Sequence, residues 1–144
     1  NGYVDNGMMA RIFKEAPVNT IWEGSGNVMC LDVLRAISRD VESIEILFQD
    51  LAATAMQDEQ LKQELQNLFK LFQQSPDDLQ FMGRSLVSRL VILAQAVLLK
   101  RHAPDFVAHG FIQSRYRAFH GQVVGMLNPR DMDVEGLLER AFAS

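Results

Sequence analysis

Glu23 lies in a glycine-flanked turn, Glu23-Gly24-Ser25-Gly26, and its surroundings suit a catalytic base. Pro17 ends the segment before the turn, and an apolar run opens directly behind Ser25, a favourable helix N-cap. A carboxylate at a helix start is a common structural choice, because the helix dipole favours negative charge there. The same geometry suits a base on a backbone that comes close to a ligand. Spacing alone favours the structural interpretation and leaves the catalytic one open.

A second group of candidates is basic and lies in the later half of the chain: Arg84, Arg89, Lys100, Arg101, Arg115 and Arg117. Sequence-independent DNA binding needs several such cations on one face. Tyr116 and Phe119 add side chains that can stack on bases. Arg84 and Arg89 are five residues apart, so they do not share a helical face well. Solvated faces that complement an acidic neighbour are the favoured interpretation of these charges.

The acidic neighbour is the segment of residues 40–78, which holds two basic and nine acidic residues. Residues 79–127 hold six basic residues and one acidic residue. We therefore expect an acidic helical half to pack beside a basic one. The net charge of the whole chain is −4, so the chain as a whole is not a generic binder of polyanions.

Histidine and cysteine chemistry is not expected. His102, His109 and His120 are seven and eleven residues apart, and no carboxylate or cysteine stands at ligand spacing beside them. We therefore predict no metal site. Cys30 lies in an apolar helical run, where a buried inert thiol is expected. A single cysteine excludes an internal disulfide and favours a reducing compartment, so we expect a cytoplasmic protein.

The elements that position these residues are predicted to be helices. Apolar residues recur at helical spacing over residues 8–15, 26–38, 40–56, 57–74, 76–102, 104–119 and 133–142, and residues 17–25 form a loop. Residues 122–127 are ambiguous. The helix that begins at Ser75-Pro76-Asp77-Asp78 is the longest and is apolar on most of its surface after Leu86, which predicts a central helix. No stretch shows sustained alternation, so we predict an all-α antiparallel bundle of six to seven helices.

The length of 144 residues suits one domain with a real core. The longest apolar run, Leu90–Leu99, is interrupted by Gln95 and is too short to span a bilayer. The first residues, Asn1–Gly7, are polar. We therefore expect neither a signal peptide nor a membrane segment.

Two motifs resemble the C-terminal segment of the acyl-CoA dehydrogenase family. They are Arg11-Ile12-Phe13-Lys14-Glu15-Ala16-Pro17 and Ile21-Trp22-Glu23-Gly24-Ser25-Gly26-Asn27. The second motif, followed by Val-Met-Cys-Leu-Asp-Val-Leu-Arg, is similar to the AidB-like subfamily of flavoproteins of the bacterial alkylation response. The similarity covers roughly the first quarter of the chain. Trp22 and the Ser-Gly-Asn sequence depart from the usual Tyr-Glu-Gly-Thr of the family.

The resemblance implies a role for each residue of the second motif. Glu23 corresponds to the base that takes the α-proton of an acyl-CoA thioester while hydride passes to the flavin of FAD. Trp22 would supply an apolar wall, and Gly24 would let the thioester approach. Ser25, Gly26 and Asn27 match positions that contact FAD, and Arg35 matches a position that the resemblance links to DNA.

The resemblance also implies a domain organisation. Residues 1–39 would end a dehydrogenase-like C-terminal domain, and residues 40–144 would form a helical extension. The chain begins within a family motif, of which Asn1-Gly2-Tyr3 remains, so we expect a fragment that is inactive alone and belongs to a homo-oligomeric flavoprotein. The alternatives are a helical module that contacts DNA and a module that holds the oligomer together, both without catalysis.

Overall fold

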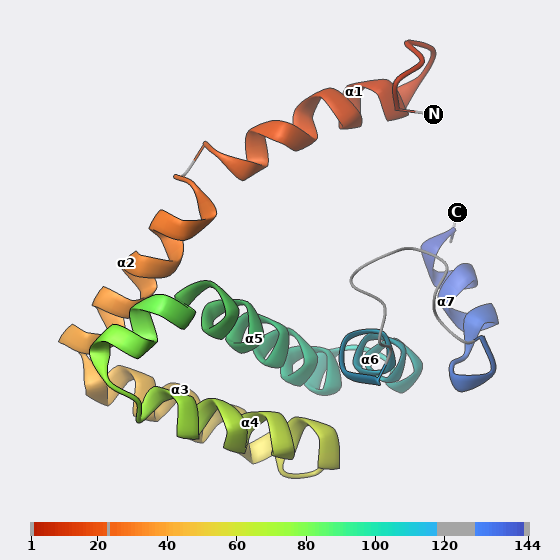
Figure 1. The fold of residues 1–144 in the computed structure, drawn as a ribbon. Coiled ribbons are helices and arrows are strands. Elements are labelled where there is room, and N and C mark those ends of the chain that lie inside the picture. The colour runs from red at the N-terminus through yellow and green to blue at the C-terminus, as the bar shows by residue number, and fades with distance from the viewer. Residues whose placement is uncertain (1, 23, 118–128, 143–144) are drawn as a thin grey trace.

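The computed structural model describes residues 2–22, 24–117 and 129–142. These residues form an all-α structure without strands, as the sequence predicts. The helices are α1 (Met8–Glu15), α2 (Gly26–Arg39), α3 (Val41–Ala55), α4 (Glu59–Phe72), α5 (Pro76–His102), α6 (Asp105–Ile112) and α7 (Val134–Ala141). Short helical segments lie at Ala16–Thr20, Gln113–Arg117 and Pro129–Asp131. Figure 1 shows α3, α4 and α5 running along one another, with α1 apart from them.

Side-chain caps explain where several helices begin. The Ser75 hydroxyl accepts a hydrogen bond from the Asp78 amide at 3.2 Å, and Pro76 follows as the first helical residue of α5. Asp58 caps α4, and Asp40 caps α3 by accepting from the Ser43 amide at 3.0 Å. Hydrogen bonds from the Ser43 side chain and backbone hold the pKa of Asp40 below its usual value. The predicted start of α5 is thus confirmed in detail.

The hydrophobic core lies between α3, α4, α5 and α6. Its buried residues are Leu51, Ala55, Leu61, Leu65, Leu68, Leu90, Leu93, Ala96, Val97 and Ile112. Phe48 packs edge-on against Phe72, with ring centroids 5.4 Å apart. Helix α5 contacts α2, α3, α4 and α6 and therefore occupies the central position that its apolar surface predicts.

Helix α5 is also the one helix of the described residues that is long and apolar enough to cross a membrane, with a mean hydropathy of 1.5 over its most apolar 18 residues. A core helix passes the same test, and buried side chains such as Leu86 and Leu93 face the bundle. We assign α5 to the core of the bundle.

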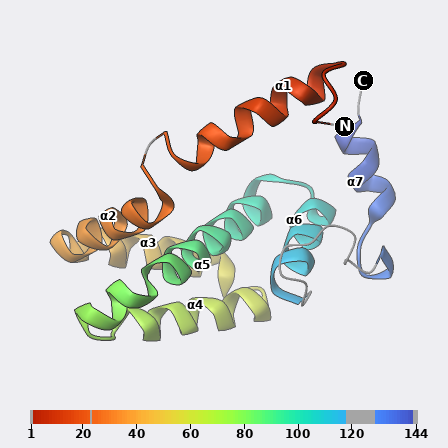
Figure 2. The ribbon, with the colours of Figure 1, turned by 45° about the horizontal axis from the view of Figure 1, so that its top comes forward.

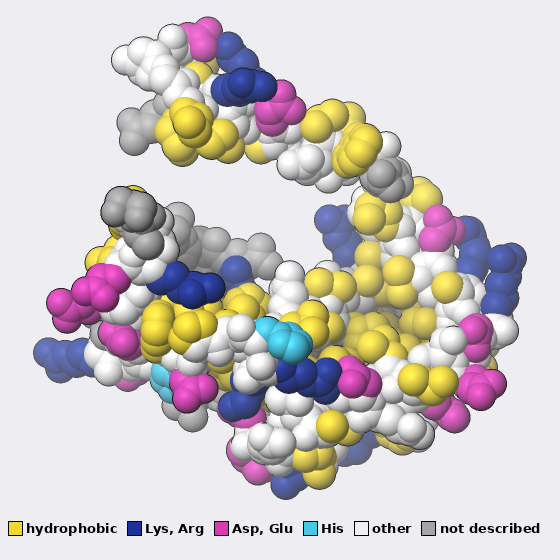
Figure 3. All heavy atoms as spheres, turned by 180° about the vertical axis from the view of Figure 1, so that it is seen from behind, with side chains coloured by type: hydrophobic (Ala, Val, Ile, Leu, Met, Phe, Trp, Pro, Cys, Tyr) yellow, Lys and Arg dark blue, Asp and Glu magenta, His cyan; other side chains and the backbone are white. Residues whose placement is uncertain are grey.

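The segment of residues 2–20, which we call the arm, stands off the bundle (Figures 1 and 3). Helix α1 forms where it is predicted, but Met9, Ile12 and Phe13 are about half exposed and do not pack on the bundle. Their contacts within the described chain are local. Residues before α1 fold back on it, since the Lys14 ammonium pairs with Asp5 at 2.9 Å. Helical periodicity identified an apolar face, but it did not identify the surface that covers this face.

The end of the chain differs from the prediction of one helix over residues 104–119. Helix α6 ends at Ile112, and a π-helical turn occupies Gln113–Arg117. The ambiguous residues 122–127 lie outside the described residues. Helix α7 packs on α6, and a Cβ atom at Gly110 would lie 3.1 Å from Leu137, so a glycine permits this close approach. Figure 2 shows α7 at the same end of the molecule as the start of α1.

Candidate functional site

The loop between the arm and α2 is built by short backbone hydrogen bonds. The amides of Ile21 and Trp22 both donate to the Val18 carbonyl, at 3.1 and 3.0 Å, and the Gly24 amide donates to the Ile21 carbonyl at 3.1 Å. Gly24 has a φ of +109°, a conformation that side chains with a Cβ rarely adopt. Glu23, the predicted base, lies outside the described residues. Hydrogen bonds to the Val18 carbonyl therefore fix the start of the loop, and the positive φ of Gly24 sets the direction in which the chain enters α2.

Ser25 occupies the N-cap position of α2, as predicted, with an extended backbone (φ −64°, ψ 150°). Within the described part of the chain, its side chain makes no capping hydrogen bond. The Ser25 carbonyl accepts the first helical hydrogen bond from the Met29 amide at 3.1 Å. The first amides of α2 are thus left without a side-chain partner from Ser25, and they lie at the positive end of the helix dipole.

Arg84 of α5 reaches the start of α2, a contact that the sequence does not predict. Its Nη1 donates to Oδ1 of Asn27 at 3.1 Å. Gly26 lies directly beside the guanidinium, because a Cβ atom there would be 3.5 Å from Nη2. Arg84 and Asn27 are 57 residues apart, and both are exposed. No local sequence motif connects the two residues. This contact could have been predicted from an expected packing of α2 on α5 together with the basic charge of Arg84.

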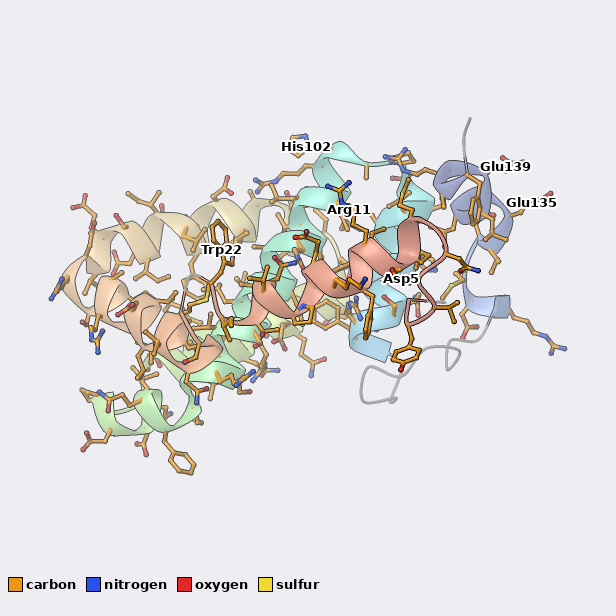
Figure 4. The ribbon with its side chains drawn as sticks, turned by 90° about the horizontal axis from the view of Figure 1, so that it is seen from above. Asp5, Arg11, Trp22, His102, Glu135 and Glu139 are labelled. Carbon is orange, nitrogen blue, oxygen red and sulfur yellow. The ribbon has the colours of Figure 1, made fainter. Side chains whose placement is uncertain are left out.

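Trp22 is 70% exposed and projects from the loop between the arm and α2 (Figure 4). The apolar wall expected from Trp22 is thus mostly exposed in this chain. Gly24 and Gly26 are half-buried, and Ser25 and Asn27 are exposed. The structure brings Gly24, Gly26 and Asn27 together at the start of α2.

Two apolar cavities lie away from this loop. The larger, of about 690 Å³, opens between α2, α3 and the neighbouring ends of α4 and α5, and Phe48, Phe72 and Leu79 contribute to its lining. The second, of about 530 Å³, lies between α3 and α4. Of the described loop residues, 21, 22 and 24–27, none lines either cavity. The described residues of the loop therefore lie outside these two cavities.

Arg35, the residue linked to DNA by resemblance, lines the larger cavity and pairs with Asp32 on the same helix. Both side chains of this pair are well exposed. A pair within one helical turn at the surface contributes little stability. Arg35 thus lies on α2, whereas the other basic candidates are carried by α5 and the segments after it.

Most of the basic candidates on α5 pair with the acidic half of the chain. Arg89 forms a two-point ion pair with Glu64, with distances of 2.6 and 2.8 Å. Lys100 contacts Asp58 at 3.3 Å, and Arg101 contacts Asp50 at 2.8 Å. These contacts confirm that an acidic half packs beside a basic one. They also occupy charges that DNA phosphates would need.

The remaining basic candidates are dispersed. Arg115 lies over the Phe111 ring, 5.6 Å from its centroid. The side chain of Arg117 and the whole of Phe119 lie outside the described residues. Arg84 contacts α2, whereas Arg89 contacts α4. The described residues therefore present no continuous basic face made from these candidates.

The two described histidines, His102 and His109, have separate surroundings. His102 lies at the end of α5 (Figure 4), whereas Nε2 of His109 is 3.0 Å from the Asp131 carbonyl oxygen. His120 lies outside the described residues. In the described ranges, no group of three or more His, Cys, Asp or Glu side chains is arranged to hold a metal ion. Cys30 is buried, as its apolar surroundings predict.

Tyr116 is half-buried near the Glu64–Arg89 pair, and its buried hydroxyl makes no hydrogen bond with the described residues. Burial, followed by the charge of Glu64, raises its pKa well above that of an ordinary tyrosine. In a Tyr3→Phe variant, which leaves Tyr116 as the one tyrosine, we expect tyrosinate absorbance to appear only well above pH about 10. Spectrophotometric titration of the folded chain tests this.

Tyr116 in the unfolded chain ionises near pH 10, whereas the folded chain retains its proton. The stability that depends on a neutral Tyr116 is therefore fully present below pH about 10, and the free energy of unfolding falls as the pH rises above this value. The same titration in denaturant is the control and should give the ordinary midpoint. An ordinary midpoint in the folded chain would contradict the buried position of Tyr116.

Two curated proteins are similar to this all-α chain and its glycine-flanked loop. AidB of Escherichia coli (strain K12), provisionally named an acyl-CoA dehydrogenase, is 30% identical over 112 residues, which cover 78% of this chain and 20% of AidB. Acyl-CoA dehydrogenase family member 11 of Caenorhabditis elegans is 30% identical over 123 residues, which cover 72% of this chain and 20% of that protein. The chain spans about a fifth of the length of these relatives.

No family profile matches the chain, and no solved structure matches it. The two similarities nevertheless extend well beyond the motifs of the first quarter. The chain is a member of the acyl-CoA dehydrogenase family and corresponds to a C-terminal part of such a protein. The resemblance inferred from Arg11–Asn27 is thereby confirmed.

Proposed function

We propose that the whole protein carrying this chain is an FAD-dependent, acyl-CoA dehydrogenase-like oxidoreductase. Its reaction would be α,β-dehydrogenation of an acyl-CoA thioester, with Glu23 as the base that takes the α-proton. The observation that carries the proposal is the family motif Trp22–Asn27 at the start of α2, where Gly24 adopts a positive φ. The two relatives with acyl-CoA dehydrogenase names support it.

The start of α2 offers donors that suit an anionic part of FAD. The amides of Gly26 and Asn27 lie at the positive end of the helix dipole, and the exposed Ser25 hydroxyl adds a further donor. Among the described residues, the Ser25 side chain does not occupy these amides. In this proposal Ser25, Gly26 and Asn27 hold the cofactor, and FAD, when bound, accepts the hydride.

The substrate side of the loop is assigned to Trp22 and Gly24. Gly24 has no side chain to keep an acyl thioester from the backbone, and Trp22 offers a large exposed apolar face. A base in this position works best when a dry pocket raises its pKa towards the working pH. In this proposal the surfaces that exclude water come from the part of the whole protein outside this chain.

The organisation proposed for the whole protein follows the same assignment. Residues 1–39 end the dehydrogenase-like domain, and residues 40–144 form a helical extension. The protein is proposed to be a cytoplasmic homo-oligomer, and this chain alone is expected to bind no FAD and to be inactive. The described loop residues line neither of the two cavities, which supports this expectation.

The test is the flavin absorbance of the full-length protein during titration with acyl-CoAs of different chain lengths. Bleaching of the flavin by an acyl-CoA is the expected result. A bound flavin that no acyl-CoA reduces would refute the dehydrogenase reaction, and a purified protein that neither contains nor takes up FAD would refute the cofactor assignment.

The arm favours a second candidate function, that of an oligomerisation module. Tyr3 and Met8 of the arm, and Ile21 and Trp22 of the adjoining loop, are at least two-thirds exposed, and a soluble monomer rarely leaves a large apolar patch uncovered. Figure 3 shows hydrophobic side chains along the arm, which is separated from the bundle by an open gap. Light scattering of the 144-residue chain tests this function: a concentration-dependent dimer or larger species supports it, and a monomer at all concentrations refutes it.

A further inference from the structure

The contact between α5 and the start of α2 joins the two parts into which the sequence divides. Arg84 belongs to the helical extension, and Asn27 belongs to the loop motif. The hydrogen bond of 3.1 Å between Nη1 of Arg84 and Oδ1 of Asn27 crosses this boundary. It is the one side-chain hydrogen bond that the described residues make between α2 and α5.

A glycine next to Arg84 sets the distance between these helices. Gly83 is buried, and a Cβ atom there would lie 3.0 Å from Cδ1 of Leu34, so α5 approaches α2 as closely as side chains allow. The next residue, Arg84, is thereby brought beside Gly26, which also lacks a side chain. Gly83 thus allows the close approach of α5 to Leu34 on α2, and Gly26 leaves room for the guanidinium at the first turn of α2.

Helix electrostatics do not account for this position of Arg84. A cation is favoured at the C-terminal end of a helix, whereas Arg84 lies at the N-terminal end of α2. Within the described residues, Arg84 takes no part in an ion pair, although Arg89, Lys100 and Arg101 on the same helix all do. The hydrogen bond to Asn27 is the interaction that the structure provides for it.

We propose that Arg84 is a positioning residue for the loop. It fixes the side chain of Asn27 and holds the first turn of α2, and through this turn it fixes the end of the loop at Gly24 and Ser25. The relevance of this role to a cofactor rests on the proposed function, in which Asn27 contacts FAD. The positioning itself is a property of this chain and is testable without any cofactor.

Two backbone hydrogen bonds report on the loop and the first turn. The Gly24 amide donates to Ile21, and the Met29 amide donates to Ser25. In an Arg84→Met variant we expect both amides to exchange with solvent about 10-fold faster, because a hydrogen bond from a charged donor is lost. Arg84→Lys keeps a donor within reach of Asn27 and should restore part of the protection.

Trp22 is the one tryptophan of the chain, so its fluorescence is a second reporter of the same loop. Its anisotropy should fall in Arg84→Met and recover in part in Arg84→Lys. Arg39→Met is the matched control, because Arg39 is an exposed arginine at the opposite end of α2. It should change neither reporter. Exchange in the core of α4 should be unchanged in all three variants, which separates local loosening from global unfolding.

The effect of Arg84 on the cofactor is tested in the full-length protein. Binding of FAD, followed by the flavin's own fluorescence, should be about 10-fold weaker in Arg84→Met than in the wild type. Unchanged exchange and anisotropy in Arg84→Met would overturn the positioning role. Altered exchange with unchanged FAD affinity would overturn its relevance to the cofactor. A wild type that binds no FAD would refute the proposed function, while the exchange experiment would still decide the positioning role.

Discussion

Replacement of Glu23 by Gln in the full-length protein is expected to slow flavin reduction by an acyl-CoA by about 100-fold or more. Glutamine has nearly the same size and fits the same glycine-flanked turn, but it cannot accept the α-proton. The measurement is the rate of flavin bleaching after rapid mixing with the acyl-CoA that reduces the wild type fastest. Flavin content should be unchanged, because Ser25, Gly26 and Asn27 are the proposed cofactor contacts.

Glu15→Gln is the control for this experiment. Glu15 is an exposed carboxylate at the end of α1, eight residues before Glu23, and it lies outside the loop motif. It should bleach at the wild-type rate. A Glu23→Gln protein that is reduced as fast as the wild type would remove Glu23 from catalysis and would leave it the structural role that the helix dipole provides.

The largest expected effect on stability belongs to Leu93→Ala. Leu93 is fully buried on the central helix α5, within the core formed by α3 to α6. Removal of its side chain leaves a cavity, so we expect the free energy of unfolding to fall by about 2–5 kcal/mol. Urea denaturation of the 144-residue chain, followed by helical circular dichroism, measures this change.

Leu98→Ala is the matched control, because it makes the same substitution on the same helix at a side chain that is 50% exposed. Its loss should stay below about 1 kcal/mol, since half of the transfer free energy and most of the cavity term are absent. Equal losses for the two variants would contradict the placement of the core on the Leu93 face of α5.

The order of helices was predictable because their starts and periods are local properties. Ser75 followed by Pro76 fixes the start of α5, and the structure uses Ser75 as the cap. A serine, Ser25, also occupies the N-cap position of α2, yet its side chain makes no capping hydrogen bond among the described residues. The residue type thus predicts where a helix begins but not whether the cap is made.

Features that depend on packing partners were less predictable. The apolar face of α1 was recognised from its spacing, but Phe13 remains about half exposed because the bundle does not reach it. In the helix predicted over residues 104–119, the hydrogen-bond pattern changes at Gln113 from α-helical to π-helical. The surroundings of an apolar face are a tertiary property, and the spacing of residues along one helix does not contain them.

The candidate site was predicted in part. The motif identified Gly24 as the glycine of the turn, and its positive φ gives the physical reason for that residue type. Charge patterning predicted that acidic and basic halves meet, and the Arg89–Glu64 pair is the clearest instance. The contact of Arg84 with Asn27 was missed, since two residues 57 positions apart are joined by helix packing alone. The position of Glu23 stays a prediction.

The distribution of the core has a consequence for how this chain can change in evolution. Every residue of the core cluster lies between Leu51 and Ile112, whereas the described residues of the arm and α2 contribute only Ala10 and Cys30 to the buried apolar set. Since most mutations are eliminated through their effect on stability, substitutions in the arm and α2 should cost this chain less stability than substitutions in the bundle core. The departures of this motif from the family pattern lie outside the core of the bundle. Changes in the loop therefore cost this chain less stability than changes in the bundle core.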